Sequence, residues 1–322
     1  MLSSQSLFAQ DPQFSQPYAS ALYLNPAFTG TTAQGRAIVG YRNQWTRLPG
    51  TFSTTSFSVD YNVPKLRSGF GILATTDKVG IASLQASMFS ALYAFDIPFS
   101  NDWHLRTGFQ FMYANRSLNF FDLTFNDQIQ NGTFTGSPSS EPTFPGASIS
   151  YFDFSAGFLL HNENVWLGVS AHHLNRPNQS LTLTESRLPT KFSVQTGLRF
   201  PVVEATRTQE GKAIITSLLY RQQGLFKQLD LGVSYVTPAV WLGLGYRGFP
   251  FQTLAQGYFN QDALVFSAGL KYDNFRFLYS YDATVSSLAG TGGSHEVSLT
   301  FRFGENEKYS GRKKFIEFPA FF

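Results

Sequence analysis

The sequence predicts an all-β protein, a transmembrane antiparallel β-barrel of about fourteen strands. Three observations predict this fold. Apolar and polar residues alternate along many segments of about ten residues, the length of a tilted membrane-spanning strand. No window of about 18 apolar residues occurs, so a transmembrane helix is excluded by length. The chain has 34 Phe and 15 Tyr but only 14% charged residues, a composition typical of aromatic strands separated by turns.

The segment from Trp103 to Ala114 shows the alternation clearly. Phe109 and Phe111 fall on one face with other apolar residues, and Arg106 and Gln110 fall on the opposite face. Because successive side chains of a strand point to opposite faces, we expect one row to contact lipid and the other to face a water-filled interior. The same pattern recurs at Lys191 to Phe200, Gln228 to Tyr235 and Glu296 to Phe303.

Runs of this kind predict the individual strands. They lie near residues 34–43, 52–62, 66–77, 83–97, 101–115, 151–161, 163–173, 190–201, 213–222, 226–236, 239–248, 261–272, 274–282 and 294–303. An even number of strands places both ends of the barrel segment on the periplasmic side, with short turns there and longer loops outside. The short connections 62–65, 161–164, 236–239 and 272–274 carry the Pro, Asn and Asp that tight turns favour. The polar connection 202–212 departs from this rule, because it is long and yet falls on the inner side.

Charged residues on the polar faces of the strands are predicted to line the lumen, where opposite charges can pair across the interior. They are Asp60, Arg106, Arg199, Asp230, Arg247, Lys271, Arg276, Asp282, Glu296 and Arg302. Aromatic residues near the strand ends are predicted to form the two girdles at the membrane interfaces: Trp103, Phe200, Tyr235, Trp241, Tyr246, Tyr272 and Phe303. The alternative is an aromatic core inside a soluble barrel, which the strand length disfavours because soluble strands average about five or six residues.

Other regions are expected outside the wall of the barrel, which spans residues 34–303. Residues 1–10 resemble the end of a secretory signal peptide, with Ala9 at a plausible cleavage position. Residues 11–33 are an N-terminal periplasmic or luminal segment, which either folds into the lumen, caps its inner mouth or remains a flexible leader. Residues 304–322 are a C-terminal periplasmic tail, which either docks a periplasmic component or is mobile. The insertion at residues 116–150 either covers the barrel mouth, meets a partner or is disordered.

No motif for catalysis, a cofactor or a metal ion occurs in the sequence, and we expect a protein that is not an enzyme. Cys is absent, which excludes disulfides and thiolate chemistry. His172 and His173 adjoin at a strand end and are predicted to point to opposite faces, so joint metal binding is not expected. The same divergence argues against a catalytic role for Ser294-His295-Glu296. The net charge of +3 comes from scattered Lys and Arg, so a nucleic-acid partner is not expected.

Several stretches carry a family resemblance. They are Asp11–Gln16, Leu22–Gly30 and Tyr41–Trp45 near the N-terminus, Ser217–Arg221 and Gln228–Gly232 in the middle, and Tyr279–Asp282 and Ser294–Leu299 near the C-terminus. In order and spacing, over nearly the whole chain, they resemble the PorP/SprF family of type IX secretion system outer-membrane proteins.

The resemblance implies a barrel of the bacterial outer membrane that belongs to the type IX secretion and gliding motility apparatus and supports the export or surface anchoring of a large protein such as an adhesin. It implies three kinds of partner, namely outer-membrane lipid, the secreted adhesin or its C-terminal domain, and periplasmic secretion components, and it implies no cofactor. The candidate partner-binding residues are Asn25, Pro26, Phe28, Tyr41, Arg42, Trp45, Phe318, Phe321 and Phe322. The alternative is a passive channel or a transporter of hydrophobic solutes.

Overall fold

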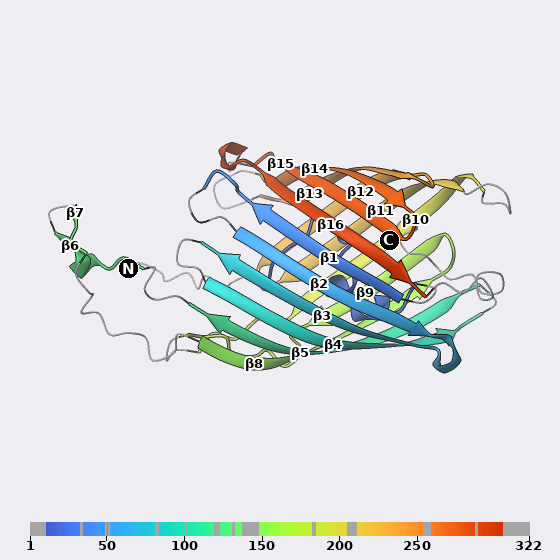
Figure 1. The fold of residues 1–322 in the computed structure, drawn as a ribbon, viewed down its shortest axis with the longest axis horizontal. Coiled ribbons are helices and arrows are strands. Elements are labelled where there is room, and N and C mark those ends of the chain that lie inside the picture. Colours follow the sequence, from blue (N-terminus) through green and yellow to red (C-terminus); the bar gives the residue numbers. More distant parts are fainter. Residues whose placement is uncertain are drawn as a thin grey trace.

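The computed structural model describes residues 11–32, 35–48, 50, 52–80, 84–100, 102–118, 123–130, 133–136, 148–181, 185–204, 211–253, 259–286 and 289–304. Fourteen antiparallel strands in this part of the chain close into one barrel (Figure 1). β5 pairs with β8 across the long insertion, and β1 pairs with β16 to close the ring. A closed ring leaves no unpaired strand edge, as a lipid environment requires. None of the helices in the described residues has the length and apolar character needed to cross a membrane.

The strands of the barrel are 8 to 15 residues long. They are β1 (Gly35–Gln44), β2 (Phe52–Val63), β3 (Ser68–Val79), β4 (Leu84–Pro98), β5 (His104–Ser117), β8 (Ser148–His161), β9 (Val165–His172), β10 (Lys191–Val203), β11 (Lys212–Gln223), β12 (Phe226–Val236), β13 (Val240–Thr253), β14 (Phe259–Tyr272), β15 (Phe275–Thr284) and β16 (Ser294–Phe303). The predicted fold and the number of strands are confirmed. The predicted strand ends agree within three residues, except at β13, which extends five residues further.

Short turns close one end of the barrel, which we call the inner end. In the turn between β8 and β9, the Asn162 side chain accepts hydrogen bonds from the N–H groups of Asn164 and Val165 at 2.9 and 2.8 Å. The turn between β2 and β3 contains the 3-10 helix η2 (Pro64–Leu66) followed by Arg67 in a left-handed conformation. The connection between β10 and β11 falls on the same end by strand alternation, and its residues 205–210 lie outside the described part.

The insertion between β5 and β8 opens from the other, outer end of the barrel. Its described part contains the 3-10 helix η4 (Asn126–Gln128) and a small hairpin of β6 (Ile129–Gln130) and β7 (Thr133–Phe134). A further 3-10 helix, η5 (Ala289–Thr291), lies in the loop between β15 and β16.

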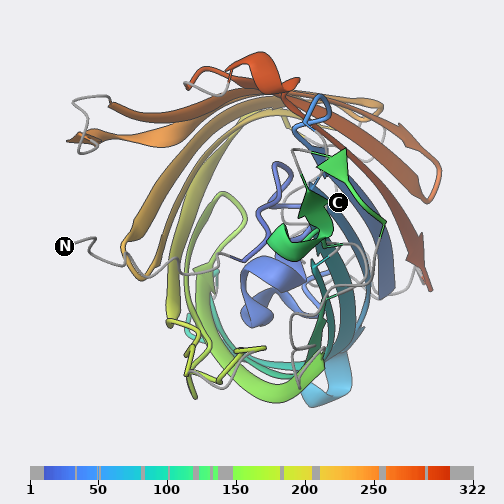
Figure 2. The same ribbon diagram turned by 90° about the vertical axis from the view of Figure 1, so that its left-hand side faces the viewer.

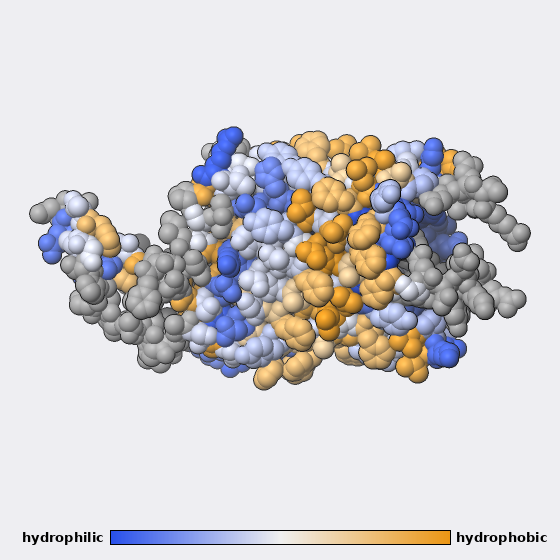
Figure 3. Space-filling model, viewed as in Figure 1, coloured by the Kyte–Doolittle hydropathy of each residue, from blue (hydrophilic) through white to orange (hydrophobic). Residues whose placement is uncertain are grey.

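The two faces of the wall differ in chemistry as predicted. On β5, Phe109 and Phe111 are exposed on the outer face, whereas Arg106 and Gln110 are buried inside. Figure 3 shows apolar side chains gathered over the middle of the strands, with hydrophilic side chains towards both ends. The prediction for Trp241 is wrong, because this residue is only 2% exposed and lies in the lumen. It shares the inward parity of Arg247 on β13 and therefore cannot join an outer girdle.

The lumen is filled by residues 11–32, which we call the plug. Figure 2 shows this segment inside the ring of strands. The plug contains α1 (Ala21–Leu24) and η1 (Pro26–Phe28), whose buried Leu22 and Phe28 belong to a cluster with wall residues such as Leu159, Trp166 and Leu278. The apolar core of the protein therefore lies between the plug and the wall.

Candidate functional site

The plug is attached to the wall at three levels, and the first is near the outer ends of β9 and β10. The Asp11 carboxylate accepts hydrogen bonds from His173 Nε2 at 2.8 Å and from Lys191 Nζ at 2.5 Å. The other ring nitrogen of His173 lies 2.5 Å from the Asp153 carboxylate. We call Asp11, Asp153, His173 and Lys191 the outer latch. It joins the start of the plug to three strands or strand ends.

The position of His173 corrects a prediction from the sequence. His172 and His173 were predicted to point to opposite faces, yet both are buried in the lumen, with their ring centroids 6.4 Å apart. β9 ends at His172, and His173 has a φ of +59°, so the alternation of a strand no longer applies to it. Within the described residues, no group of three or more His, Asp or Glu side chains is arranged to hold a metal ion.

The charges of the outer latch stabilise one another. Burial alone would lower the pKa of His173, but the nearby carboxylates of Asp11 and Asp153 raise that pKa to about 9. Burial also opposes ionisation of Asp11, yet His173 and Lys191 hold the pKa of this carboxyl well below its usual range. The histidine is therefore a cation and Asp11 an anion at neutral pH.

We expect the outer latch to weaken as the pH rises from about 6.5, the usual pKa of histidine, through about 9, the pKa of His173 in the folded protein. A raised histidine pKa stabilises the folded state fully below the unfolded pKa, and this contribution is lost as the pH passes the folded pKa. Asp11 has a lowered pKa, so its own contribution is lost only on acidification. The chain has no Cys, so a spin label on Gln13→Cys reports on the plug alone.

The mobility of this label should increase across that pH interval in the otherwise unchanged chain. In a His173→Gln background, the label should be mobile at both pH values and show no further change. A label whose mobility is the same at pH 6.5 and above pH 9 in the unchanged chain would contradict the assignment.

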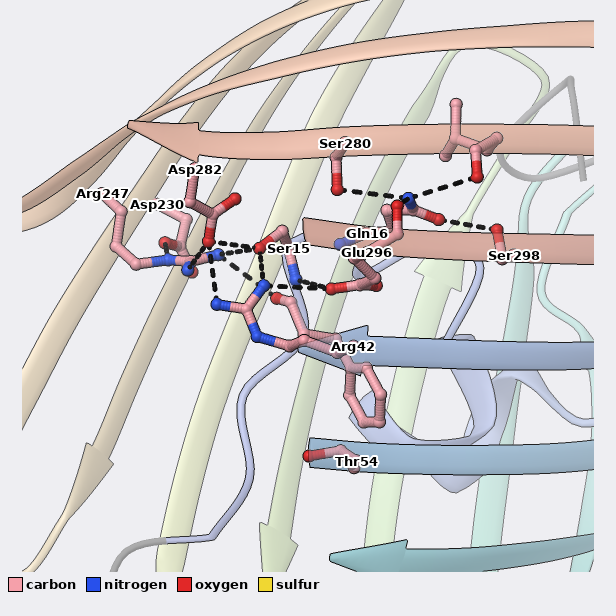
Figure 4. Close-up of polar contacts among 12 residues, drawn as sticks. Ser15, Gln16, Arg42, Thr54, Asp230, Arg247, Ser280, Asp282, Glu296 and Ser298 are labelled. Atoms are coloured by element: carbon pink, nitrogen blue, oxygen red, sulfur yellow. Dashed lines mark hydrogen bonds and ion pairs between the residues drawn. The ribbon is translucent and has the colours of Figure 1, made fainter. Parts of the chain in front are cut away.

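The second level of attachment is a network that we call the central clamp, made by Ser15 and Gln16 of the plug with Arg42, Arg247, Asp282 and Glu296 of the wall (Figure 4). The Ser15 N–H donates to Glu296 at 2.6 Å, and the Ser15 hydroxyl donates to Asp282 at 2.6 Å. Arg42 and Arg247 each lie 2.8 Å from the same oxygen of Asp282. All four wall residues are at least nine-tenths buried. Their two positive and two negative charges balance one another, and the plug adds hydrogen bonds.

Gln16 extends the central clamp along β15 and β16. Its side-chain nitrogen donates to the Ser280 hydroxyl at 3.1 Å and to the Glu296 carbonyl at 3.0 Å. Its side-chain oxygen accepts a hydrogen bond from the Ser298 hydroxyl at 2.6 Å. Both the nitrogen and the oxygen of the Gln16 side-chain amide therefore have hydrogen-bond partners.

Glycines of the wall let the plug backbone approach closely at η1. A Cβ atom added at Gly108 would lie 2.5 Å from Ala27 Cα, and one added at Gly69 would lie 2.7 Å from the carbonyl carbon of Thr29. Real Cβ atoms do not approach other atoms so closely. The Asn25 side chain, which faces Gly157, donates to the carbonyl oxygens of Phe158 and Val169 at 3.1 and 3.2 Å. Any larger residue at Gly69 or Gly108 would meet plug backbone and displace η1.

The third level of attachment is the inner clamp, formed by Gly30, Arg36, Asp60 and Arg106. Asp60 accepts hydrogen bonds from Arg36 at 3.0 and 3.2 Å and from the Gly30 N–H at 2.8 Å. Arg106 donates to the carbonyl oxygens of Ala27 and Thr29 at 3.2 and 2.5 Å. The plug thus runs from the outer end of the lumen, at Asp11, to the inner end, at Gly30.

The structure places the predicted luminal charges in two groups. Seven are buried inside the barrel: Asp60, Arg106, Arg247, Arg276, Asp282, Glu296 and Arg302. Asp230, Arg199 and Lys271 are half-buried, and Asp230 is paired with Arg221 and Arg247. The ion pairs join strands that are adjacent or two apart, such as Arg36 on β1 with Asp60 on β2 and Arg247 on β13 with Asp282 on β15. They therefore run along the wall and not across the lumen.

The candidate partner-binding residues lie in different places. Asn25, Pro26, Phe28 and Arg42 are buried inside the barrel and contact the chain itself. Tyr41 faces outwards, and Trp45 packs edge-on against Phe52 at 4.8 Å near the outer end of β1. Phe318, Phe321 and Phe322 lie outside the described residues, as does the predicted signal remnant. A role in partner binding remains a prediction for the set. Of the four buried residues, Asn25, Pro26 and Phe28 belong to the plug, and Arg42 donates a hydrogen bond to Ser15 of the plug.

Sequence reasoning missed most plug contacts. Asp153 has the inward parity of its predicted strand, so this parity could have placed it in the lumen. Ser15 and Gln16 carried no signal, because their partners Asp282 and Glu296 are separated from them by more than 260 residues.

The closed wall of long strands, its apolar outer row and its filled polar lumen define an integral outer-membrane β-barrel protein. The chain belongs to the PorP/SprF family, since the family model for the type IX secretion system membrane protein PorP/SprF matches residues 6–301. This match confirms the resemblance found in the sequence. The protein is located in the bacterial outer membrane.

Similar solved structures are also outer-membrane barrels. A deletion mutant of the monoaromatic hydrocarbon channel TodX has 11% identity and a TM-score of 0.50, with 89% of this chain and 94% of that chain covered. The toluene transporter TbuX of Ralstonia pickettii has 11% identity and a TM-score of 0.49 over the same shares of the chains. The Acinetobacter baumannii protein Omp33 has 8% identity and a TM-score of 0.44, with 84% and 99% covered. Such low identities concern the fold alone. The search of curated proteins found no match to this chain.

Proposed function

We propose that this protein supports the export or surface anchoring of a large cell-surface protein, such as a gliding adhesin, as a closed barrel that binds partners and does not conduct the cargo. Its partners would be outer-membrane lipid, the adhesin or its C-terminal domain, and periplasmic components of type IX secretion. Membership of the PorP/SprF family supports the role in secretion. The observation that carries the closed-barrel part is the attachment of the plug at the outer latch, the central clamp and the inner clamp.

A polypeptide could pass through this lumen only if the plug moved. Movement of Ser15 and Gly30 would remove hydrogen bonds from Glu296, Asp282 and Asp60, all of which are buried. The carboxylates would keep their arginine partners, but each lost hydrogen bond to a buried charged group costs about 1.5–3 kcal/mol. Partners are therefore expected to bind the loops and chain ends of the barrel, where no such cost arises.

A disulfide between the plug and the wall tests whether the plug must move. A Cβ atom at position 157 would lie 2.8 Å from Asn25 Cγ, which is the place of the sulfur in a cysteine at position 25. This spacing suits a disulfide. The double variant Asn25→Cys, Gly157→Cys has no competing thiol, because the natural chain has no Cys.

We express the double variant in a strain that lacks the natural gene and measure surface display of the cargo. We expect the oxidised form to restore display as well as the reduced form does. The deletion itself should abolish display of one large surface protein and leave the uptake of small solutes unchanged. The two single-cysteine variants serve as controls for the substitutions. If display failed only in the oxidised form, the plug would have to move and the closed-barrel proposal would be wrong.

The second candidate function is a passive channel or a transporter of hydrophobic solutes. A cavity lined largely by apolar side chains beside the plug, around Trp166 and Trp241, favours this alternative. For the closed barrel, we expect no steady ion conductance from the purified protein in planar bilayers. Conductance that disappears on oxidation of the Asn25→Cys, Gly157→Cys variant would favour the channel instead.

A further inference from the structure

Two cavities lie one below the other between the plug and the inner faces of β10, β11 and β12. The outer cavity, of about 50 Å³, is lined by Ser193 and Gln228 among other residues. The deeper cavity, of about 80 Å³, is lined by Gln195, Trp166 and Trp241 among others. Leu24 of the plug lines both cavities. They therefore follow the same stretch of wall from the outer end towards the middle of the lumen.

The deeper cavity is walled by aromatic and aliphatic side chains. Trp166 and Trp241 are almost fully buried beside it. Gly197 makes room for Trp166, since an added Cβ would overlap the indole ring. Tyr18 of the plug closes the cavity from the other side, with its ring centroid 6.2 Å from that of Trp241. Such a site favours an occupant that brings a compact apolar group.

Among the polar side chains that line this cavity, Gln195 has no hydrogen-bond partner in the described part of the chain. The residue is 3% exposed, and neither its side-chain nitrogen nor its side-chain oxygen makes a hydrogen bond. The hydroxyl of Ser193, two residues along the same face, is buried and unpaired in the same way. An unpaired buried amide is costly, so an occupant that both donates and accepts hydrogen bonds would be stabilised here.

The charges at the edge of the deeper cavity are already paired. Arg247 Nε lies 2.8 Å from the Asp230 carboxylate, and both residues line the cavity. A charged occupant would find no unpaired opposite charge and would lose its hydration. The occupant is therefore uncharged.

We infer that the deeper cavity binds a small uncharged molecule, or a segment of a peptide, in which a compact aliphatic group is joined to an amide. An amide supplies the donor and the acceptor that Gln195 lacks. The volume of about 80 Å³ has room for roughly five to eight non-hydrogen atoms, since about 10–15 Å³ of such space holds one water molecule. This size matches a branched aliphatic chain with one amide and excludes bulky ligands.

Isovaleramide, an amide of this size, is the first probe, and the protein is studied in lipid nanodiscs. The substitutions Trp45→Phe and Trp103→Phe leave Trp166 and Trp241 as the only tryptophans, because the chain has four. We expect a saturable change in their fluorescence with isovaleramide and binding weaker by about tenfold or more with isovalerate, its charged analogue, because that charge would be desolvated without a partner.

Gln195→Leu should weaken isovaleramide binding by about tenfold through the lost hydrogen bonds. Gln195 has no partner to lose, so this variant should fold normally. Ser234→Leu, which places a larger side chain in the deeper cavity, should abolish binding. Gln110→Leu is the matched control, because Gln110 is a buried luminal glutamine that lines a different cavity, and it should bind as the unchanged chain does.

A second probe distinguishes a free molecule from a peptide segment. N-acetyl-leucinamide is too large for the deeper cavity alone, but its additional amide can extend into the outer cavity and reach Ser193. Tighter binding than that of isovaleramide therefore indicates a peptide, and equal or weaker binding indicates a free amide. Non-saturable fluorescence changes, equal binding of isovalerate or unchanged binding by Gln195→Leu would each overturn the inference. None of these results depends on whether the protein acts in secretion.

Discussion

Replacing Asp60 by Ala is expected to destabilise the folded barrel by about 3–5 kcal/mol and to release the inner end of the plug. Asp60 is the acceptor for both Arg36 and the Gly30 N–H. Arg36 is completely buried, so the substitution would leave its guanidinium charge without a counter-ion. Reversible urea unfolding in lipid vesicles measures the free energy of unfolding.

The control for this experiment is Glu185→Ala. Glu185 pairs with Arg187 at 2.6 Å, but the two side chains are 61% and 59% exposed. Exposed pairs contribute within about 1 kcal/mol, so this variant should unfold almost as the unchanged chain does. Equal unfolding of the two variants would mean that the buried pair does not hold the inner clamp.

Replacing Gly108 by Leu is expected to push η1 away from β5 and to open a path for ions through the lumen. The first added carbon would already lie 2.5 Å from Ala27 Cα, and the conflict is with backbone, which cannot swing aside. Overpacking of this kind costs about 1–3 kcal/mol, and displacement of the plug relieves it. Planar-bilayer recordings should therefore show openings that the unchanged protein lacks.

Gly290→Leu is the matched control for that substitution. A Cβ atom at Gly290 meets no other atom within 4 Å, so this variant should remain closed. Gly108→Leu in the oxidised Asn25→Cys, Gly157→Cys background should conduct less than Gly108→Leu alone, because the disulfide retains the plug. A closed Gly108→Leu barrel would show that the glycine is not needed for the fit of η1.

The strands could be predicted from the sequence because their signal is local. Alternation with a period of two residues depends only on which face meets lipid, so it located β5 and β16 and gave Arg106 and Arg302 their inward direction. The errors occurred where another rule applied. Trp241 was assigned by residue type although its parity on β13 placed it inside, and His173 was assigned by parity although β9 had ended.

The plug contacts could not be predicted in the same way. Residues 11–32 have no repeating pattern, and their partners are brought close only when the barrel closes. The Ser15 hydrogen bond to Glu296 spans 281 positions of the chain. Gly69 and Gly108 have the inward parity of their strands, but only the path of η1 shows what they accommodate.

The central clamp bears on how this barrel can open sideways. β1 and β16 meet along ten residue pairs, and Arg42 stands directly opposite Glu296 in that register. Ser15 binds both of these side chains from within the lumen, so the plug links β1 to β16, the first and last strands of the barrel. Before β1 and β16 could separate to form a lateral gate, Ser15 and Gln16 would have to release their wall partners. The plug therefore reinforces the wall where its first and last strands meet.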